Sequence, residues 1–154
     1  MLIKKFVLLT LLVLLVIGVV LSGGCAPSQV ALTATPHPAI SNTVTIIENI
    51  TTQAANTLIQ ENKSNADFVI LDVRTPEEFA DGHIENAVNI DFYLATFRDE
   101  LDRLDKNKTY LVYCRSGSRS FSAAKIMETL KFKKIYNMLD GIIGWRAEGL
   151  PTIK

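Results

Sequence analysis

A short polar segment between two apolar patterns of different period most constrains the fold of this chain. Residues 110–113 form an apolar run typical of a buried strand, and residues 120–130 carry apolar side chains at helical spacing, namely Phe121, Ala124, Met127 and Leu130. The segment between them consists of Cys114, Arg115, Ser116, Gly117, Ser118 and Arg119. A strand that passes through a tight loop into a helix is typical of α/β folds. We therefore predict that Cys114 ends a strand and that its loop opens a helix.

The residues around Cys114 favour a reactive thiol. A cysteine after a strand is usually a small buried apolar side chain. Here the N–H groups of a loop that opens a helix converge on one spot, and the helix dipole adds partial positive charge. Arg115 and Arg119 add two further charges, and Gly117 gives the backbone freedom. Such surroundings favour the nucleophilic thiolate, so we predict a loop that holds an anion beside a reactive sulfur.

Strand and helix patterns alternate around this segment. We expect strands at residues 44–47, 68–73, 87–90, 110–113 and 134–138. We expect a helix at residues 51–62, with Ala55, Leu58 and Ile59 inward, and a second that begins at a capping box formed by Thr75 and Glu78. Apolar spacing predicts further helices around Phe97, Leu101 and Leu104 and at residues 120–130. A last helix is expected after Asp140 and Gly141. This order predicts an α/β domain whose mostly parallel central sheet is flanked by helices, with ligands at the carboxyl ends of the strands.

The sequence of residues 1–24 predicts a signal peptide or membrane anchor. Lys4 and Lys5 precede an uncharged run over residues 6–21, and small residues then lead to Cys25. The arrangement resembles a prokaryotic lipoprotein signal, which implies that Cys25 is lipidated and becomes the mature N-terminus. The alternative is an uncleaved anchor helix. Both interpretations place the rest of the chain outside the cell membrane, facing the periplasm or the cell exterior, because the basic residues stay inside.

Composition divides the remaining chain into a linker and one domain. Residues 25–43 begin at the lipidation site, contain Pro, Ser, Thr and Ala without charge, and are expected to form a flexible linker. Residues 44–154 are long enough for one core. The formal net charge is +0, so no basic excess indicates nucleic-acid binding.

The cysteine content also favours a function for Cys114. The chain has 2 cysteines, and lipidation of Cys25 would leave Cys114 without a partner in the chain. A structural disulfide and an internal two-cysteine redox cycle are then excluded. A lone thiol in an exported domain is open to oxidation, so its presence favours a use for it.

Three segments in order resemble the rhodanese-like family. They are residues 72–90, the Cys114 loop followed by Ser120, and residues 136–145 followed by Gly149, Leu150 and Pro151. Asp140 stands where the family usually has the first of two glycines, and we expect a local change of turn there. The resemblance implies a single rhodanese-like domain over residues 44–154.

Three residues of the first segment are expected to support the site. Asp72 and Arg74 end a buried strand, where charges are normally paired, so we expect an internal ion pair or backbone contacts, with a direct catalytic role as the alternative. The resemblance makes His83 a structural link between this segment and the active-site side of the domain. A general-base role for His83 is the alternative.

The resemblance implies a sulfurtransferase that works through a persulfide on Cys114. Cys114 would take sulfur from a small anionic donor such as thiosulfate, held by Arg115 and Arg119, and pass it to a thiol, sulfite or cyanide acceptor. The N–H groups of residues 115–119 would stabilise the outer sulfur. No metal or organic cofactor is expected. A non-enzymatic sulfur carrier or binding module on the same fold is the alternative. A phosphatase or arsenate reductase is disfavoured, because those related loops are one residue longer.

Overall fold

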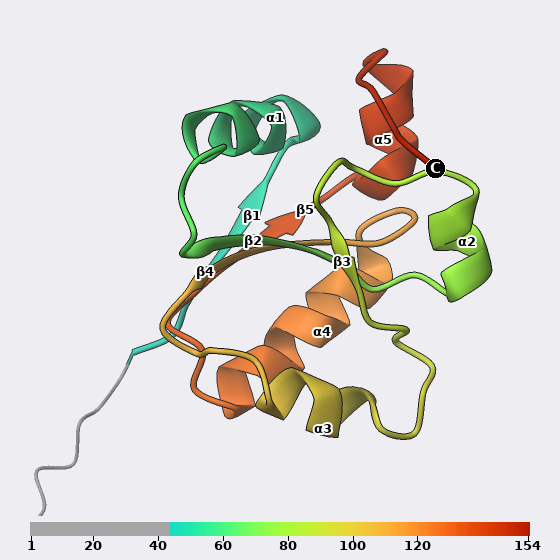
Figure 1. The fold of residues 1–154 in the computed structure, drawn as a ribbon. Coiled ribbons are helices and arrows are strands. Elements are labelled where there is room, and N and C mark those ends of the chain that lie inside the picture. The colour runs from blue at the N-terminus through green and yellow to red at the C-terminus, as the bar shows by residue number, and fades with distance from the viewer. Residues whose placement is uncertain (1–43) are drawn as a thin grey trace, which may run out of the picture. The chain divides into compact units, whose positions relative to one another are not determined.

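The computed structural model describes residues 44–154, which form a five-stranded sheet between layers of helices (Figure 1). The strands are β1 (Ile46–Ile50), β2 (Phe68–Asp72), β3 (Val88–Asn89), β4 (Thr109–Tyr113) and β5 (Lys134–Met138). They lie in the order β1-β5-β4-β2-β3, and each neighbouring pair is parallel. The predicted α/β class is confirmed, and the sheet is parallel throughout.

The helices cover both faces of the sheet and its carboxyl end. They are α1 (Thr52–Glu61), α2 (Pro76–Ala80), α3 (Phe97–Asp102), α4 (Ser118–Thr129) and α5 (Gly141–Ala147). Figure 1 shows α1 and α5 on one face of the sheet and α3 and α4 on the other. The starts of α2, α4 and α5 lie at the end of the sheet where the parallel strands finish. That end is where this class of fold binds ligands.

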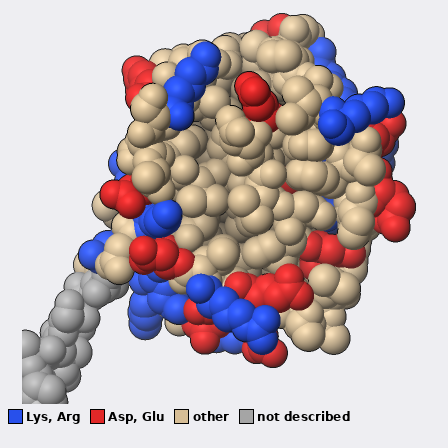
Figure 2. Space-filling view, in the orientation of Figure 1, with Lys and Arg blue, Asp and Glu red and all other residues tan. Residues whose placement is uncertain are grey.

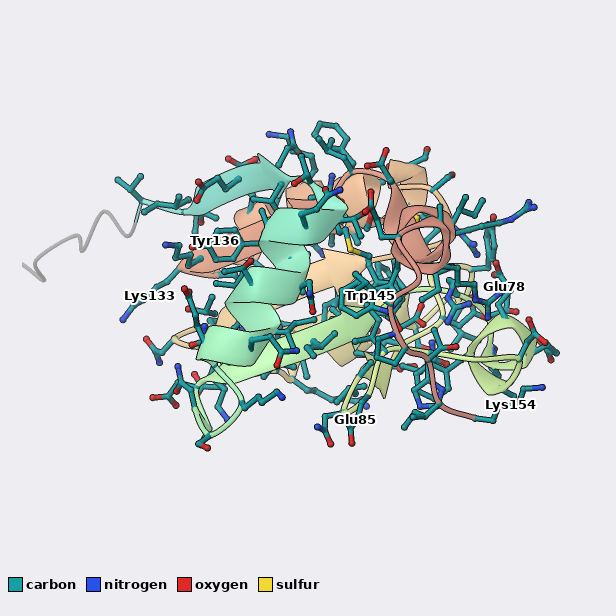
Figure 3. All side chains as sticks on the ribbon, turned by 90° about the horizontal axis from the view of Figure 1, so that it is seen from above. Glu78, Glu85, Lys133, Tyr136, Trp145 and Lys154 are labelled. Atoms are coloured by element: carbon teal, nitrogen blue, oxygen red, sulfur yellow. The ribbon has the colours of Figure 1, made fainter. Side chains whose placement is uncertain are left out.

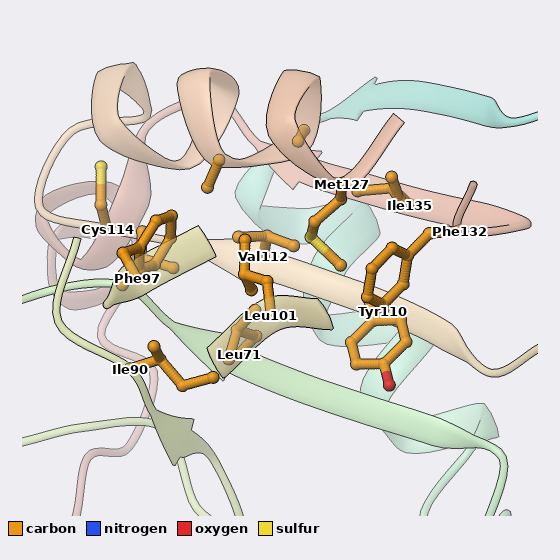
Figure 4. Close-up of a cluster of buried hydrophobic side chains, with 13 residues drawn as sticks. Leu71, Ile90, Phe97, Leu101, Tyr110, Val112, Cys114, Met127, Phe132 and Ile135 are labelled. Carbon is orange, nitrogen blue, oxygen red and sulfur yellow. The ribbon is translucent and has the colours of Figure 1, made fainter. Parts of the chain in front are cut away.

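Alternation along β4 divides the core into two clusters. Tyr110 and Val112 belong to the cluster beneath α3 and α4, together with Cys114 (Figure 4). Leu111 and Tyr113 belong to the cluster beneath α1 and α5. Because successive side chains of a strand point to opposite faces, the register of β4 determines that Cys114 projects toward α4.

The bounds of the first strand and the position of Phe121 differ from those that the sequence predicted. The first strand runs from Ile46 to Ile50 because Ile46 pairs with Lys134 and Ile50 with Met138, whereas the apolar pattern placed it at residues 44–47. Phe121, expected inward, is exposed. Helix α4 buries Ser120, Ala123, Ala124 and Met127, a face at helical spacing to which Phe121 does not belong.

The surface in Figure 2 carries Lys, Arg, Asp and Glu interspersed around its edge. No broad area of one charge sign lies on this face. In residues 44–154, no helix has the length and apolar character needed to cross a membrane. The expected signal peptide or anchor (residues 1–24), the lipidation site Cys25 and the linker lie outside the described residues.

Candidate active site

Cys114 lies directly after β4, the central strand, and before the helix α4. Figure 4 shows its sulfur at one end of the buried cluster, near the start of α4. The helix begins at Ser118, with Gly117 as its N-cap. Ser118 and Arg119 are therefore helical, and the non-helical part of the loop is shorter than the six residues that the sequence indicated.

Gly117 is required at its position. Its φ is +90°, in the left-handed region, and a Cβ there would lie 1.8 Å from the carbonyl oxygen of Leu139. Gly141, with a φ of +55°, is similarly constrained, because a Cβ would lie 2.5 Å from the carbonyl oxygen of Cys114. Its neighbour Asp140 has an ordinary right-handed conformation that needs no glycine. The turn between β5 and α5 therefore packs closely against the Cys114 loop.

The start of α5 also holds the loop through hydrogen bonds. The N–H of Ile142 donates to the carbonyl oxygen of Cys114 at 2.9 Å. The N–H of Ile143 donates to the carbonyl oxygen of Arg115 at 3.1 Å. Because these two carbonyl oxygens accept hydrogen bonds from α5, contacts from outside the loop help to fix its conformation.

Hydrogen-bond donors surround the Cys114 sulfur. The N–H of Gly117 lies 3.2 Å from Sγ, and the hydroxyl of the buried Ser120 lies 3.6 Å from it. Burial raises the pKa of the Cys114 thiol, but hydrogen bonds from the N–H and hydroxyl of Ser120 and from the N–H groups of Ser116 and Gly117 outweigh this, and the pKa is lowered. The thiolate is thus favoured although the Cys114 side chain itself is almost wholly buried.

Ser120 was not among the predicted site residues. It is fully buried, and its hydroxyl also approaches the carbonyl oxygen of Gly117 at 3.0 Å. A serine in the first turns of a helix ordinarily faces solvent or a backbone group. The available signal was its place on the same helical face as Ala123, Ala124 and Met127.

Arg119 forms a two-point ion pair with Glu78. Its Nη1 lies 2.7 Å from one carboxylate oxygen and its Nη2 lies 2.8 Å from the other. Hydrogen bonds from Arg119 hold the pKa of Glu78 below its usual range. The Arg119 guanidinium also lies 5.4 Å from the centre of the Tyr93 ring. The cation that the sequence assigned to an anionic donor is therefore already paired with a carboxylate.

Glu78 reaches this position because the predicted capping box forms. The Thr75 hydroxyl accepts from the Glu78 N–H, and the Glu78 carboxylate accepts from the Thr75 N–H. Pro76 stands in the first turn of α2. The carboxylate that caps α2 is thus also the partner of Arg119 across the cleft.

An open cleft of about 430 Å³ leads to Cys114. It is lined by Glu78, Tyr93, Cys114, Arg115, Ser116, Ser118 and Arg119. Arg115 is exposed and makes no ion pair with any described residue. The structure therefore brings the loop residues together, and it adds Glu78 and Tyr93, which the sequence did not indicate as part of the site.

Asp72 and Arg74 form the expected ion pair in the interior. Arg74 Nε lies 2.9 Å from Asp72 Oδ2, and both side chains are buried. The remaining guanidinium nitrogens donate to the carbonyl oxygens of Glu78 at 2.8 Å and Gly82 at 3.0 Å. The pair therefore ties the end of β2 to α2 and to the segment that follows it.

His83 lies away from the cleft. Its Nδ1 is 3.0 Å from the carbonyl oxygen of Phe79, and its ring stacks on the Phe79 ring with centroids 3.6 Å apart. Its backbone forms an isolated antiparallel bridge with Ile153. His83 does not line the cleft around Cys114, and these contacts favour the linking role over that of a general base.

Comparisons with known proteins identify the family of the domain. The family description "Rhodanese-like domain" matches residues 53–148. A sulfurtransferase from Allochromatium vinosum is 31% identical over 99 residues, which cover 64% of this chain and 91% of that protein. The thiosulfate sulfurtransferase GlpE from Coxiella burnetii is 35% identical over 81 residues, which cover 53% of this chain and 74% of that protein.

Solved structures show the same fold. The crystal structure of a rhodanese-like domain protein from Staphylococcus aureus matches with a TM-score of 0.55 and 34% identity, over 70% of this chain and 98% of that one. A rhodanese-related protein from Thermoplasma volcanium matches with a TM-score of 0.57 and 29% identity, over 69% of this chain and 97% of that one. On its sequence and its fold, this chain belongs to the rhodanese-like domain family.

Proposed function

We propose that this protein is a sulfurtransferase that carries sulfur as a persulfide on Cys114. The observation that supports this most is the position of the Cys114 sulfur, which lies beside the Gly117 N–H and the Ser120 hydroxyl at the base of an open cleft. This arrangement favours a thiolate and leaves room for a small molecule in front of it.

In the first step, the Cys114 thiolate attacks the outer sulfur of thiosulfate. A bond forms between the two sulfurs, the S–S bond of thiosulfate breaks, and sulfite leaves with the electron pair. The product is a persulfide on Cys114, and no external oxidant or reductant takes part. Arg115, exposed and without an ion-pair partner among the described residues, attracts the anionic donor.

In the second step, a nucleophile removes the outer sulfur. Cyanide, sulfite or a thiolate attacks that sulfur, the persulfide bond breaks, and Cys114 leaves as a thiolate. The donors that lower the pKa of the Cys114 thiol also make it a good leaving group in this step, because they stabilise its negative charge.

The experiment that tests this function is the intact mass of the purified protein after incubation with thiosulfate. We expect a gain of one sulfur atom that disappears when cyanide is added and is absent in Cys114→Ala. Repeated turnover with both reagents separates an enzyme from a carrier, which would load once and release sulfur only to its partner. A protein that gains no sulfur from thiosulfate or from inorganic polysulfide contradicts the proposal.

We further propose that the domain is held on the outer side of the cell membrane by a lipid on Cys25. The support is the sequence alone: the basic start, the apolar run and the small residues before Cys25. Full-length protein from a prokaryotic host should partition with membranes, lack residues 1–24 and carry a diacylglyceryl group. The Cys25→Ser variant should block this processing. A membrane-bound chain that keeps Met1 and has no lipid supports the uncleaved anchor instead.

A further inference from the structure

A second cavity lies on the face of the sheet opposite to Cys114. It has a volume of about 560 Å³ and shares no lining residue with the cleft at Cys114. Figure 3 shows Trp145, one of its lining residues, beside α1 and on the side of that helix away from Lys133 and Tyr136. The floor belongs to the apolar cluster beneath α1 and α5, through Ile59, Phe68, Ile70, Ile84 and Trp145. A cavity of this size and character suits a small organic ligand.

The polar side chains around this cavity are mostly neutral amides. Those of Asn62 and Asn65 bond to each other and to the backbone, so they are committed to the turn after α1. The side chains of Asn56 and Gln60 share one hydrogen bond of 3.4 Å, which leaves the Asn56 amide nitrogen and the Gln60 carbonyl oxygen available. Asn86 lines the cavity from the segment before β3. Because an amide both donates and accepts hydrogen bonds, this wall suits a ligand with groups of the same kind.

Two charges of opposite sign stand at the cavity. Lys63 and Glu85 are the charged residues among those that line it in the described chain. Both are exposed, and neither forms an ion pair with a described residue. Lys63 follows α1, whereas Glu85 lies in the segment that leads to β3. A ligand with one anionic end and one cationic end complements these two charges.

The sheet has an open edge at the same place. Every residue of β2 pairs with β4 on one side, but on the other side only Leu71 and Asp72 pair with β3. Residues 68–70 therefore have no strand partner on that side within the described chain. Phe68 and Ile70 belong to this unpaired stretch and also line the cavity. Such an edge can accept the extended backbone of a peptide.

We propose that this cavity binds a short peptide with free termini. The peptide backbone lies along residues 68–70 of β2 and bonds to the available amides of the wall. An apolar side chain of the peptide packs on the floor beside Trp145, its carboxylate faces Lys63 and its ammonium group faces Glu85. A peptide thus matches the floor, the amides, the two charges and the strand edge together. A neutral sugar would leave the two charges and the strand edge unused.

Trp145 gives a direct readout of binding, because it is the only tryptophan of the chain and lines the cavity. The probe is trileucine, and we expect a saturable change in tryptophan fluorescence when it is titrated into the purified protein. N-acetyl-trileucine amide keeps the side chains but has no charged terminus. It should bind about fivefold more weakly, because two exposed charge pairs are lost. Cellobiose, a neutral sugar, should cause no saturable change.

Two variants test the contacts. Asn86→Gly removes the amide and keeps the backbone, because Asn86 has a φ of +63° that glycine adopts readily. It should bind trileucine about fivefold more weakly, as for the loss of a hydrogen bond. Lys63→Gln should weaken trileucine about threefold and leave the capped peptide unaffected. The matched control is Lys133→Gln, since Lys133 is also exposed and lies on the other side of α1 from Trp145 (Figure 3).

The control variant should bind trileucine like the wild type, and all three variants should keep the wild-type rate of sulfur transfer and the wild-type circular dichroism. The absence of a saturable change with trileucine overturns the inference, as does a capped peptide that binds equally well. An unchanged affinity in Asn86→Gly, or an equal loss in Lys63→Gln and Lys133→Gln, also overturns it. Tighter binding of cellobiose than of trileucine assigns the cavity to a carbohydrate instead.

Discussion

Two arginine–carboxylate pairs lie at the same end of the sheet, and they differ in what surrounds them. The pair of Arg74 and Asp72 is sealed in the interior, whereas that of Arg119 and Glu78 stands partly exposed at the cleft. Glu78 joins both, because its carbonyl oxygen accepts from Arg74 and its carboxylate from Arg119. The comparison teaches that burial decides the role of a pair: the interior pair maintains the framework, and the cleft pair sets the charge beside Cys114.

The largest expected effect is a loss of sulfur transfer without a matching loss of stability. Cys114→Ala should reduce sulfur transfer from thiosulfate to cyanide to the background rate, because no other described thiol can form the persulfide. The free energy of unfolding should change by only about 1 kcal/mol, since the substitution removes only the sulfur atom and therefore little side-chain volume. Steady-state assays and urea unfolding measure the two quantities. An alanine variant that keeps a substantial rate contradicts the persulfide mechanism.

Breaking the interior pair should affect stability most. Asp72→Asn leaves the Arg74 guanidinium buried without a compensating charge, which is expected to lower the free energy of unfolding by about 3–5 kcal/mol. Urea unfolding at neutral pH measures this. The control is Asp81→Asn, which removes an exposed partner of Arg146 and should leave stability almost unchanged. A loss in Asp72→Asn as small as in the control would show that the interior pair has no structural role.

The thiolate environment should respond to Ser120. Because hydrogen bonds lower the pKa of the Cys114 thiol, alkylation by iodoacetamide should reach its half-maximal rate at a lower pH than for an ordinary thiol. Ser120→Ala removes the hydroxyl donor and should raise the pKa, so that alkylation below the wild-type midpoint slows several-fold. Ser116→Ala keeps its N–H and serves as the control. A midpoint that does not move in Ser120→Ala excludes the hydroxyl as a cause.

The smallest expected effect is on stability, from the partly exposed ion pair of Arg119 and Glu78 at the cleft. Glu78→Gln should cost about 0.5–1 kcal/mol at neutral pH, as partly exposed ion pairs do. The folded-state pKa of Glu78 is lowered, so its contribution is complete above the unfolded value of ~4.3 and is lost as the pH falls through the folded value. The variant should therefore lose less stability on acidification than the wild type.

Unfolding curves between neutral and acidic pH measure this difference. Glu61→Gln, which removes an exposed carboxylate without an ion pair among the described residues, is the control. A variant with the same acid dependence as the wild type would show that the Arg119–Glu78 pair does not contribute to stability.

The sequence was sufficient for the fold class and for Cys114, because both depend on local patterns. The switch from a strand pattern to a helix pattern around Cys114 predicted its place at the end of β4. The capping box of Thr75 and Glu78 is likewise local and forms as predicted. The bounds of β1 were less predictable, since an edge strand tolerates the polar Glu48 and Asn49 that interrupt its apolar pattern.

The walls of the cleft could not be predicted, because they depend on tertiary contacts. Glu78 meets Arg119 across 41 positions of sequence, and no spacing rule connects them. Tyr93 comes from the segment before α3, where no pattern predicted a contact with α4. The outward position of Phe121 follows from which face of α4 meets the sheet, and this is set by packing.

The hydrogen bonds from Ile142 and Ile143 to the Cys114 loop have a consequence for biosynthesis. A growing chain holds all six loop residues well before α5 has been made, and the carbonyl groups of Cys114 and Arg115 then have no partner. The loop gains its geometry only when the last helix docks. We therefore expect the thiol to remain an ordinary, slowly reacting one throughout translation, and to gain its enhanced reactivity only in the finished domain.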